Sequence, residues 1–110
     1  GISVANLHLS LGRDDQATQL SAVGEHLPRK SPFLVVGDFN CTNSSTHLEA
    51  FAEANKAQIA NHPQIPTFPS WRPQRDLDHI VYSDLVSLEH RRSHALQLSD
   101  HLPVSAEIHF

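Results

Sequence analysis

The chain has 110 residues, 39% of them hydrophobic, which suits one small globular domain with a single core. Its formal net charge of −4 is opposite in sign to the broad basic surface of a dedicated nucleic-acid binder, and its single cysteine excludes an internal disulfide and a multi-cysteine zinc site. No apolar run approaches the about 20 residues that a membrane-spanning helix needs, so we expect a soluble chain with no transmembrane segment.

The first part of the chain predicts a strand followed by an amphipathic helix. Residues 2–11 alternate apolar and polar side chains in part, which predicts a strand with His8 on the face opposite to the neighbouring leucines. Residues 13–27 carry apolar side chains three or four positions apart. Two aspartates in the first turn of this segment and Pro28 directly after its last residue complete the pattern of a helix.

The middle of the chain predicts a buried strand and a second helix. Residues 33–36 are a continuous apolar run between a proline and a glycine, which is typical of a strand covered on both faces. Thr46 and Glu49 have the spacing of a capping box, and the apolar stripe after them predicts a helix from residue 46 to about residue 57.

The last part of the chain predicts an irregular loop and three strands. Four prolines in residues 60–76 remove backbone donors and restrict the residues before them, so we expect a shaped loop there. Residues 77–82, 85–91 and 104–110 have the composition and alternation of strands.

Four short segments place an acid, an amide or an imidazole beside an apolar strand. They read NLHL at residues 6–9, GDFN at 37–40, LDHI at 77–80 and SDHLP at 99–103. In open α/β sheets, functional sites gather at strand ends and in the loops beyond them. The coincidence of four such segments is therefore more informative than any one of them.

In their order and spacing, these segments resemble the carboxyl-terminal half of the endonuclease/exonuclease/phosphatase (DNase-I-like) superfamily, over nearly all of the chain. GDFN and SDHLPV carry the resemblance together, and TFPSWRP followed by LDHI is most similar to uncharacterised bacterial members. The resemblance implies an α/β fold of the α+β type, as half of a four-layer α/β/β/α sandwich with one mixed sheet and helices on one face. It also implies hydrolysis of phosphodiesters or phosphomonoesters with Mg²⁺ or Mn²⁺.

The resemblance assigns roles to three residues that handle water, phosphate and metal. Asp38 is implied to hold and activate the water, and Asn40 to hold the phosphate or that water. Asp100 is implied as a metal-site carboxylate, which agrees with the preference of hard cations for oxygen ligands. Taken singly, each of these residues can equally be an ordinary turn residue that satisfies backbone donors.

The resemblance also implies a pair of catalytic histidines. His101 is expected to face the scissile phosphate, with Asp78 accepting its hydrogen bond and favouring the cationic imidazole. His8 is expected to donate to a phosphoryl oxygen. The alternatives are that His8 is an ordinary strand histidine and that Asp78 pairs with Arg75.

Other residues with reactive side chains have weaker patterns. Cys41 is disfavoured as a nucleophile, because the nearby Asp38 opposes thiolate formation. His79 is expected to be packed and hydrogen-bonded, since it points to the face opposite to Asp78. Trp71 is either a stacking platform or lid at the phosphate site, or a plug that packs its loop against the core.

The superfamily has an amino-terminal half with an asparagine and a metal-binding glutamate that these residues do not supply. We therefore expect residues 1–110 to be one domain, the carboxyl-terminal half of a catalytic domain that is inactive by itself. Its exposed sheet face would be covered by the missing half or by a second copy in a homodimer. The substrate classes left open are nucleic acids, phospholipid head groups and small phosphoesters. The alternative function is a noncatalytic binding domain or inactive fragment that retains the fold, and the default localisation is cytoplasmic.

Overall fold

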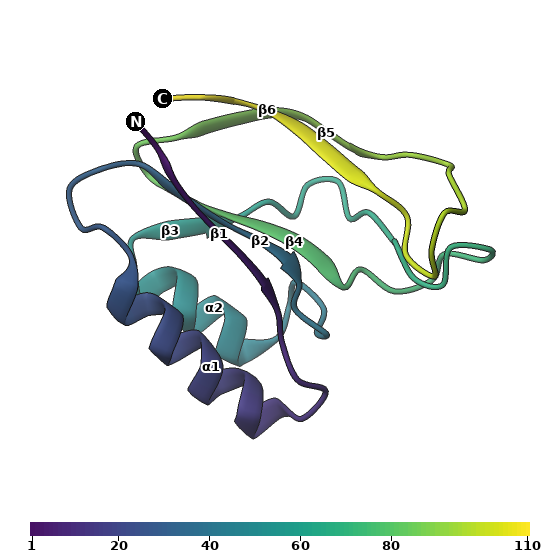
Figure 1. Ribbon diagram of the computed structural model, residues 1–110, viewed down its shortest axis with the longest axis horizontal. Coiled ribbons are helices and arrows are strands. Elements are labelled where there is room, and N and C mark those ends of the chain that lie inside the picture. Colours follow the sequence, from purple (N-terminus) through teal and green to yellow (C-terminus); the bar gives the residue numbers. More distant parts are fainter.

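The computed structural model describes residues 1–110 and arranges them in three layers (Figure 1). Two helices cover one face of a four-stranded sheet, and a two-stranded ribbon lies on the side of that sheet away from the helices. Neither helix is long and apolar enough to cross a membrane. The elements are β1 (Ser3–His8), α1 (Arg13–His26), β2 (Phe33–Asp38), α2 (Thr46–Ala54), β3 (Ala57–Ile59), β4 (Asp78–Ser83), β5 (Ser87–Ser93) and β6 (Val104–His109).

The main sheet is mixed, as predicted, and has the strand order β1-β2-β4-β3. The strands β1 and β2 are parallel, which needs a crossover connection, and α1 supplies it. The expectation of a single sheet is wrong, because β5 and β6 pair only with each other. The short strand β3, which the sequence did not predict, pairs with the edge of β4 away from β2.

The second helix begins at residue 46, as predicted, but its capping and its last residue differ from the prediction. Its N-cap is Ser45, and no side chain caps the helix, so the capping box at Thr46 and Glu49 is wrong. The Thr46 hydroxyl instead accepts a hydrogen bond from Arg13 at 2.5 Å. The helix ends at Ala54 because the chain turns through Lys56, whose φ of 51° is left-handed, and enters β3.

The core lies between the helices and the main sheet. The two helices contribute Leu20, Leu48 and Phe51, which pack against Val35 of β2 and Val81 of β4. Leu7 of β1 and Leu9 directly after the strand turn toward this core while His8 stays exposed, as the alternating pattern predicts. The opposite face of the sheet carries no helix, so its side chains are only partly covered.

One polar side chain is buried among these apolar residues. Gln16 of α1 is 2% exposed, and its Nε2 donates to the carbonyl oxygens of Ser10, Leu11 and Asn40. Burying an amide is tolerated only when it is hydrogen-bonded, and these bonds tie the loop after β1 to the loop after β2. Gln16 therefore fixes the two loops relative to each other.

We predict that Gly37→Ala destabilises the protein by about 3 kcal/mol. Gly37 has a φ of 133°, and a Cβ at this position would collide with the carbonyl oxygen of Leu7 on the neighbouring strand. Chemical unfolding followed by circular dichroism measures the loss. Gly12→Ala is the matched control, since its Cβ would meet only Asp15 Oδ2 at 3.7 Å; an equal loss in both variants would contradict the prediction.

Candidate active site

Strand register places three polar residues in one row at one end of the main sheet. The parallel pairing of β1 and β2 aligns His8 with Asp38, and the antiparallel pairing of β2 and β4 aligns Asp38 with Asp78. Side chains at alternate positions of a strand share a face. Two further rows of aligned residues therefore lie on the same face of the sheet, the one away from the helices. Those rows are Asn6, Val36 and Ile80, then Val4, Leu34 and Tyr82.

His101 completes the row from the loop that precedes β6. Its Nδ1 lies 2.6 Å from Asp78 Oδ2, and its Nε2 lies 3.5 Å from Asp38 Oδ2. The Nε2 atom of His8 lies 3.4 Å from the same Asp38 oxygen. Two imidazoles thus flank one carboxylate, and a second carboxylate supports the His101 ring from behind.

The surroundings of His101 favour its protonated form. Burial alone would lower the pKa of this imidazole. The hydrogen bond to Asp78 and the negative charges of Asp78, Asp38 and Asp100 outweigh burial and raise the pKa above its ordinary value. His101 therefore keeps its cationic form beside the Asp38 carboxylate up to a higher pH than an ordinary histidine does.

The turn after β2 holds Asp38 in a defined orientation. The backbone N–H of Asn40 donates to Asp38 Oδ1 at 2.8 Å, and Asn40 adopts a left-handed φ of 50°, which asparagine tolerates better than most residues. The Asn40 side chain donates from Nδ2 to the Leu9 carbonyl at 2.6 Å. Oδ2 of Asp38 is consequently the oxygen turned toward both imidazoles.

Two residues of the proline-rich loop also belong to the site, although the sequence analysis assigned no role to either. The buried Thr67 donates from its hydroxyl to Asp78 Oδ2 at 2.5 Å, so one carboxylate oxygen accepts from both Thr67 and His101. The ring of Phe68 lies 5.0 Å from the His101 ring. Their only sequence signal is the TFPSWRP stretch, whose pattern does not reveal these contacts.

The donor set includes oxygens suited to a hard divalent cation. Asp38, Asp78 and His101 each offer one ligand atom, and these atoms lie within 4.8 Å of one another. Carboxylate oxygens match Mg²⁺ or Mn²⁺, whereas the imidazole is already bonded to Asp78. Asp100 is exposed and lies outside this group, next in sequence to His101, and its backbone carbonyl accepts from the Ser70 N–H at 2.8 Å.

His79 and Cys41 form a structural pair behind the site. His79 is buried and donates from Nε2 to the Cys41 carbonyl at 2.6 Å, which confirms its prediction as a packed, hydrogen-bonded residue. Burial lowers the pKa of His79 and so favours the neutral ring. Burial also raises the pKa of the Cys41 thiol, and the charges of Asp76 and Asp38 act in the same direction. Cys41 therefore lacks the acidity of a catalytic thiol.

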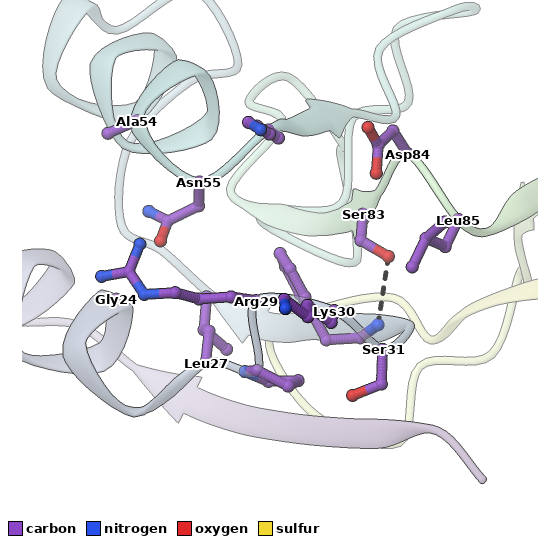
Figure 2. Close-up of a pocket in the computed structure, with 13 residues that line it drawn as sticks. Gly24, Leu27, Arg29, Lys30, Ser31, Ala54, Asn55, Ser83, Asp84 and Leu85 are labelled. Carbon is purple, nitrogen blue, oxygen red and sulfur yellow. Dashed lines mark hydrogen bonds between the residues drawn. The ribbon is translucent and has the colours of Figure 1, made fainter.

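Two cavities lie at opposite ends of the main sheet. One of about 540 Å³ opens beside Asp78, between the uncovered sheet face and the start of β6. The other, of about 340 Å³, is lined by Arg29, Lys30 and Asp84 and contains no histidine (Figure 2). At its wall the Phe33 backbone N–H donates to the Ser83 hydroxyl at 3.1 Å. Only the first cavity adjoins the four-residue row.

Residues 2–101 match the sequence profile of the Endonuclease/Exonuclease/phosphatase family. The chain belongs to this family. No curated protein is significantly similar to it in sequence. Solved structures of other proteins resemble this family member in fold. Their sequence identities to it are below 25%, so the similarity shows a shared fold and nothing more.

Three of these structures show how much of a longer chain is matched. A protein of unknown function from Enterococcus faecalis is 21% identical, with a TM-score of 0.79 over 96% of this chain and 49% of that chain. A Bacteroides thetaiotaomicron mannosyl-6-phosphatase is 20% identical, with a TM-score of 0.80 over 96% and 50%. The human nocturnin catalytic domain, with a bound sulfate anion, is 24% identical, with a TM-score of 0.60 over 97% and 46%. The family member described here spans about half the length of each.

The comparisons agree with the DNase-I-like α/β architecture implied by the sequence motifs. All six residues that the resemblance selected lie at the same end of the main sheet or in the loops beside it. The row consists of His8, Asp38, Asp78 and His101. The adjoining loops carry Asn40 and Asp100. The four members of the row are in direct proximity, whereas the side chain of Asn40 points to the loop after β1 and Asp100 faces solvent.

We predict that His101 and His79 titrate on opposite sides of the ordinary histidine pKa of 6.5. The pKa of His101 is raised by Asp78, so its contribution to stability is full below 6.5 and is lost as pH rises through its folded-state pKa. The pKa of His79 is lowered by burial, so folding is favoured as pH rises toward 6.5. Histidine chemical shifts followed by NMR against pH measure both values.

The variant Asp78→Asn tests the cause of the His101 shift. It removes the hydrogen-bonded carboxylate, so the pKa of His101 should fall while that of His79 changes little. Asp84→Asn, which neutralises an exposed carboxylate at the other end of β4, serves as the control. An unchanged His101 pKa in Asp78→Asn would show that Asp78 does not set the charge of the imidazole.

Proposed function

We propose that the protein is a divalent-metal-dependent phosphoesterase and that this chain forms the carboxyl-terminal half of its catalytic domain. The observation that carries the proposal is the Asp38 carboxylate flanked at 3.4 and 3.5 Å by His8 and His101. Membership of the family supports a phosphoesterase, and so does the similarity in fold to a mannosyl-6-phosphatase. A site with one carboxylate between two imidazoles can both activate water and bind an anion.

In the proposed mechanism, Asp38 orients and deprotonates the attacking water. Its Oδ1 accepts from the Asn40 backbone N–H, which leaves Oδ2 to accept a proton from a water in line with phosphorus. The rigid end of β2 and the turn at Asn40 fix this oxygen before the substrate arrives. Such fixed placement of a base is what makes proton transfer efficient.

His101 supplies positive charge where the phosphoryl oxygens gather negative charge. Asp78 holds its Nδ1, so the Nε2–H, which lies 3.5 Å from Asp38 Oδ2, is directed to the place where the substrate and the attacking water would meet. Thr67 in turn holds Asp78 through the same oxygen, which keeps the imidazole orientation fixed. His8, whose side chain is 75% exposed, is the second donor to a phosphoryl oxygen.

A divalent cation is part of the proposal. Asp100, the metal-site carboxylate that the family resemblance implies, would hold Mg²⁺ or Mn²⁺, and the remaining ligands would come from residues outside this chain. When bound, the cation supplies Lewis-acid stabilisation of the charge on the phosphoryl oxygens. The residues of this chain then position the water, the phosphate and the proton donors.

The partly covered face of the main sheet is proposed to pack against the other half of the catalytic domain. Val4 on this face is 58% exposed, and its row continues into Leu34 and Tyr82. The matched structures are about twice the length of this chain, which favours another segment of the same protein over the homodimer expected from the sequence. The homodimer has no independent support.

We predict Mg²⁺-dependent turnover of bis-p-nitrophenyl phosphate or p-nitrophenyl phosphate by the full-length protein. Asp38→Asn and His101→Asn should each lower kcat by a factor of about 10² to 10⁴, because they remove the proposed base and the cation at the phosphate. Chelation of divalent cations should remove the activity, and added Mg²⁺ or Mn²⁺ should restore it. Release of p-nitrophenolate measures all of these rates.

His90→Asn provides the matched control. It also removes an imidazole beside carboxylates, but His90 lies exposed on β5, away from the Asp38 row, so the activity should be unchanged. No turnover of either ester, with all histidines intact and metal present, would favour the noncatalytic binding domain. Turnover that survives His101→Asn would also count against the proposed mechanism.

A further inference from the structure

Trp71 is a large apolar side chain held in solvent on a short, well-anchored loop. It is 66% exposed, which excludes the alternative that it plugs the loop against the core. Phe68 and Arg75 form an isolated bridge that closes residues 68–75 into a tight hairpin, and Trp71 lies within it. Exposing an indole forgoes the stabilisation that burial would give, so a fixed exposed tryptophan is suited to binding.

Several hydrogen bonds attach this hairpin to the loop that bears the catalytic imidazole. Ser70 donates from its backbone N–H to the Asp100 carbonyl at 2.8 Å and from its hydroxyl to the Ser99 carbonyl at 2.6 Å. Trp71 therefore directly follows a residue bonded on both its backbone and its side chain to the segment before His101. In Figure 1 the tip of the teal loop reaches the same end of the molecule as the yellow-green segment leading into β6.

Chain geometry limits the distance between Trp71 and the site. Phe68 touches the His101 ring, with centroids 5.0 Å apart, and Trp71 is three residues further along. Three residues span at most about 11 Å, even when fully extended. Trp71 is thus carried by a segment that contacts the His101 ring directly.

We propose that Trp71 is a stacking platform that selects phosphate esters whose organic group carries a ring, such as a pyranose or a nucleobase. This inference rests on the proposed phosphoesterase site and names its substrate class. The flat indole face stacks on any ring with an accessible apolar or π face, and such stacking tolerates variation in the ring. A small acyclic ester such as glycerol phosphate gains nothing from it.

The neighbouring Arg72 fits the same substrate class. It is exposed, so its guanidinium is free to donate to ring hydroxyls or carbonyls at the edge of a stacked ring. The chain as a whole carries a formal charge of −4, so a local cation beside the platform also offsets the repulsion that an anionic substrate meets. Stacking and donation then act on the same part of the substrate.

Intrinsic fluorescence tests the platform without any need for turnover. Trp71 is the only tryptophan among these 110 residues, and the difference in emission between the full-length protein and its Trp71→Phe variant isolates the signal of this position. Glucose 6-phosphate and uridine monophosphate should change the emission in a saturable way, and the two compounds separate pyranose from base recognition. Glycerol phosphate and inorganic phosphate should leave it unchanged. No response to either ring compound, or an equal response to glycerol phosphate, would overturn the inference.

Steady-state kinetics on the full-length protein give the second readout. Trp71→Ala should raise KM for the preferred ring-bearing ester about tenfold and leave kcat and the hydrolysis of glycerol phosphate unchanged, and Trp71→Phe should retain most of the affinity. Phe110→Ala removes another exposed aromatic, 65% exposed at the end of the chain, and should change nothing. Equal effects on both esters would overturn the platform. Absence of turnover for every ester would overturn the phosphoesterase proposal, and the fluorescence titration would still decide the platform.

Discussion

The candidate site depends on the register of three strands. The pairing of β1 with β2 and of β2 with β4 brings His8, Asp38 and Asp78 side by side although they are far apart in sequence. A shift of one residue in either pairing would turn one of these side chains to the helix-covered face. Gly37 helps to fix this register, since only a residue without a side chain can lie so close to the Leu7 carbonyl. Backbone pairing thus sets the geometry on which the proposed chemistry relies.

A second layer of contacts gives the site its electrostatic character. Asp78 accepts from His101 and Thr67 through one oxygen, and Asp38 accepts from the Asn40 backbone. Each carboxylate is therefore held by a hydrogen bond from a residue other than histidine, Thr67 for Asp78 and Asn40 for Asp38, and each lies beside the His101 ring. The contrast with His79 is instructive, because that ring lies on the opposite face, bonds to a neutral carbonyl and is driven toward its neutral form by burial. The two faces of β4 thus act in opposite directions: the pKa of His101, beside Asp78, is raised, whereas the pKa of His79 is lowered.

Much of the fold follows from patterns that are visible in the sequence, because periodicity reports directly on which face of an element is buried. The alternation around His8 and the apolar run at residues 33–36 predicted β1 and β2. The strand β3 has only three residues, which is too few to show a periodic pattern, so the sequence did not predict it. The sequence also did not predict that β5 and β6 form a ribbon separate from the main sheet. The N-cap at Ser45 was missed because Thr46 and Glu49 have the spacing of a capping box, which favoured Thr46 as the cap.

The candidate site was accessible from the sequence mainly through the family resemblance. Single motifs identified Asp38 and His101, whereas the role of Thr67 depends on a tertiary contact that no local pattern encodes. His101 and Asp78 are 23 residues apart in sequence, and β5, the first strand of the ribbon, lies between them. A partly folded chain that has formed only the helices and the main sheet would contain both aspartates without the imidazole. Such an intermediate would have nearly native far-ultraviolet dichroism, so spectroscopic evidence of folding would not by itself establish that the catalytic centre had assembled.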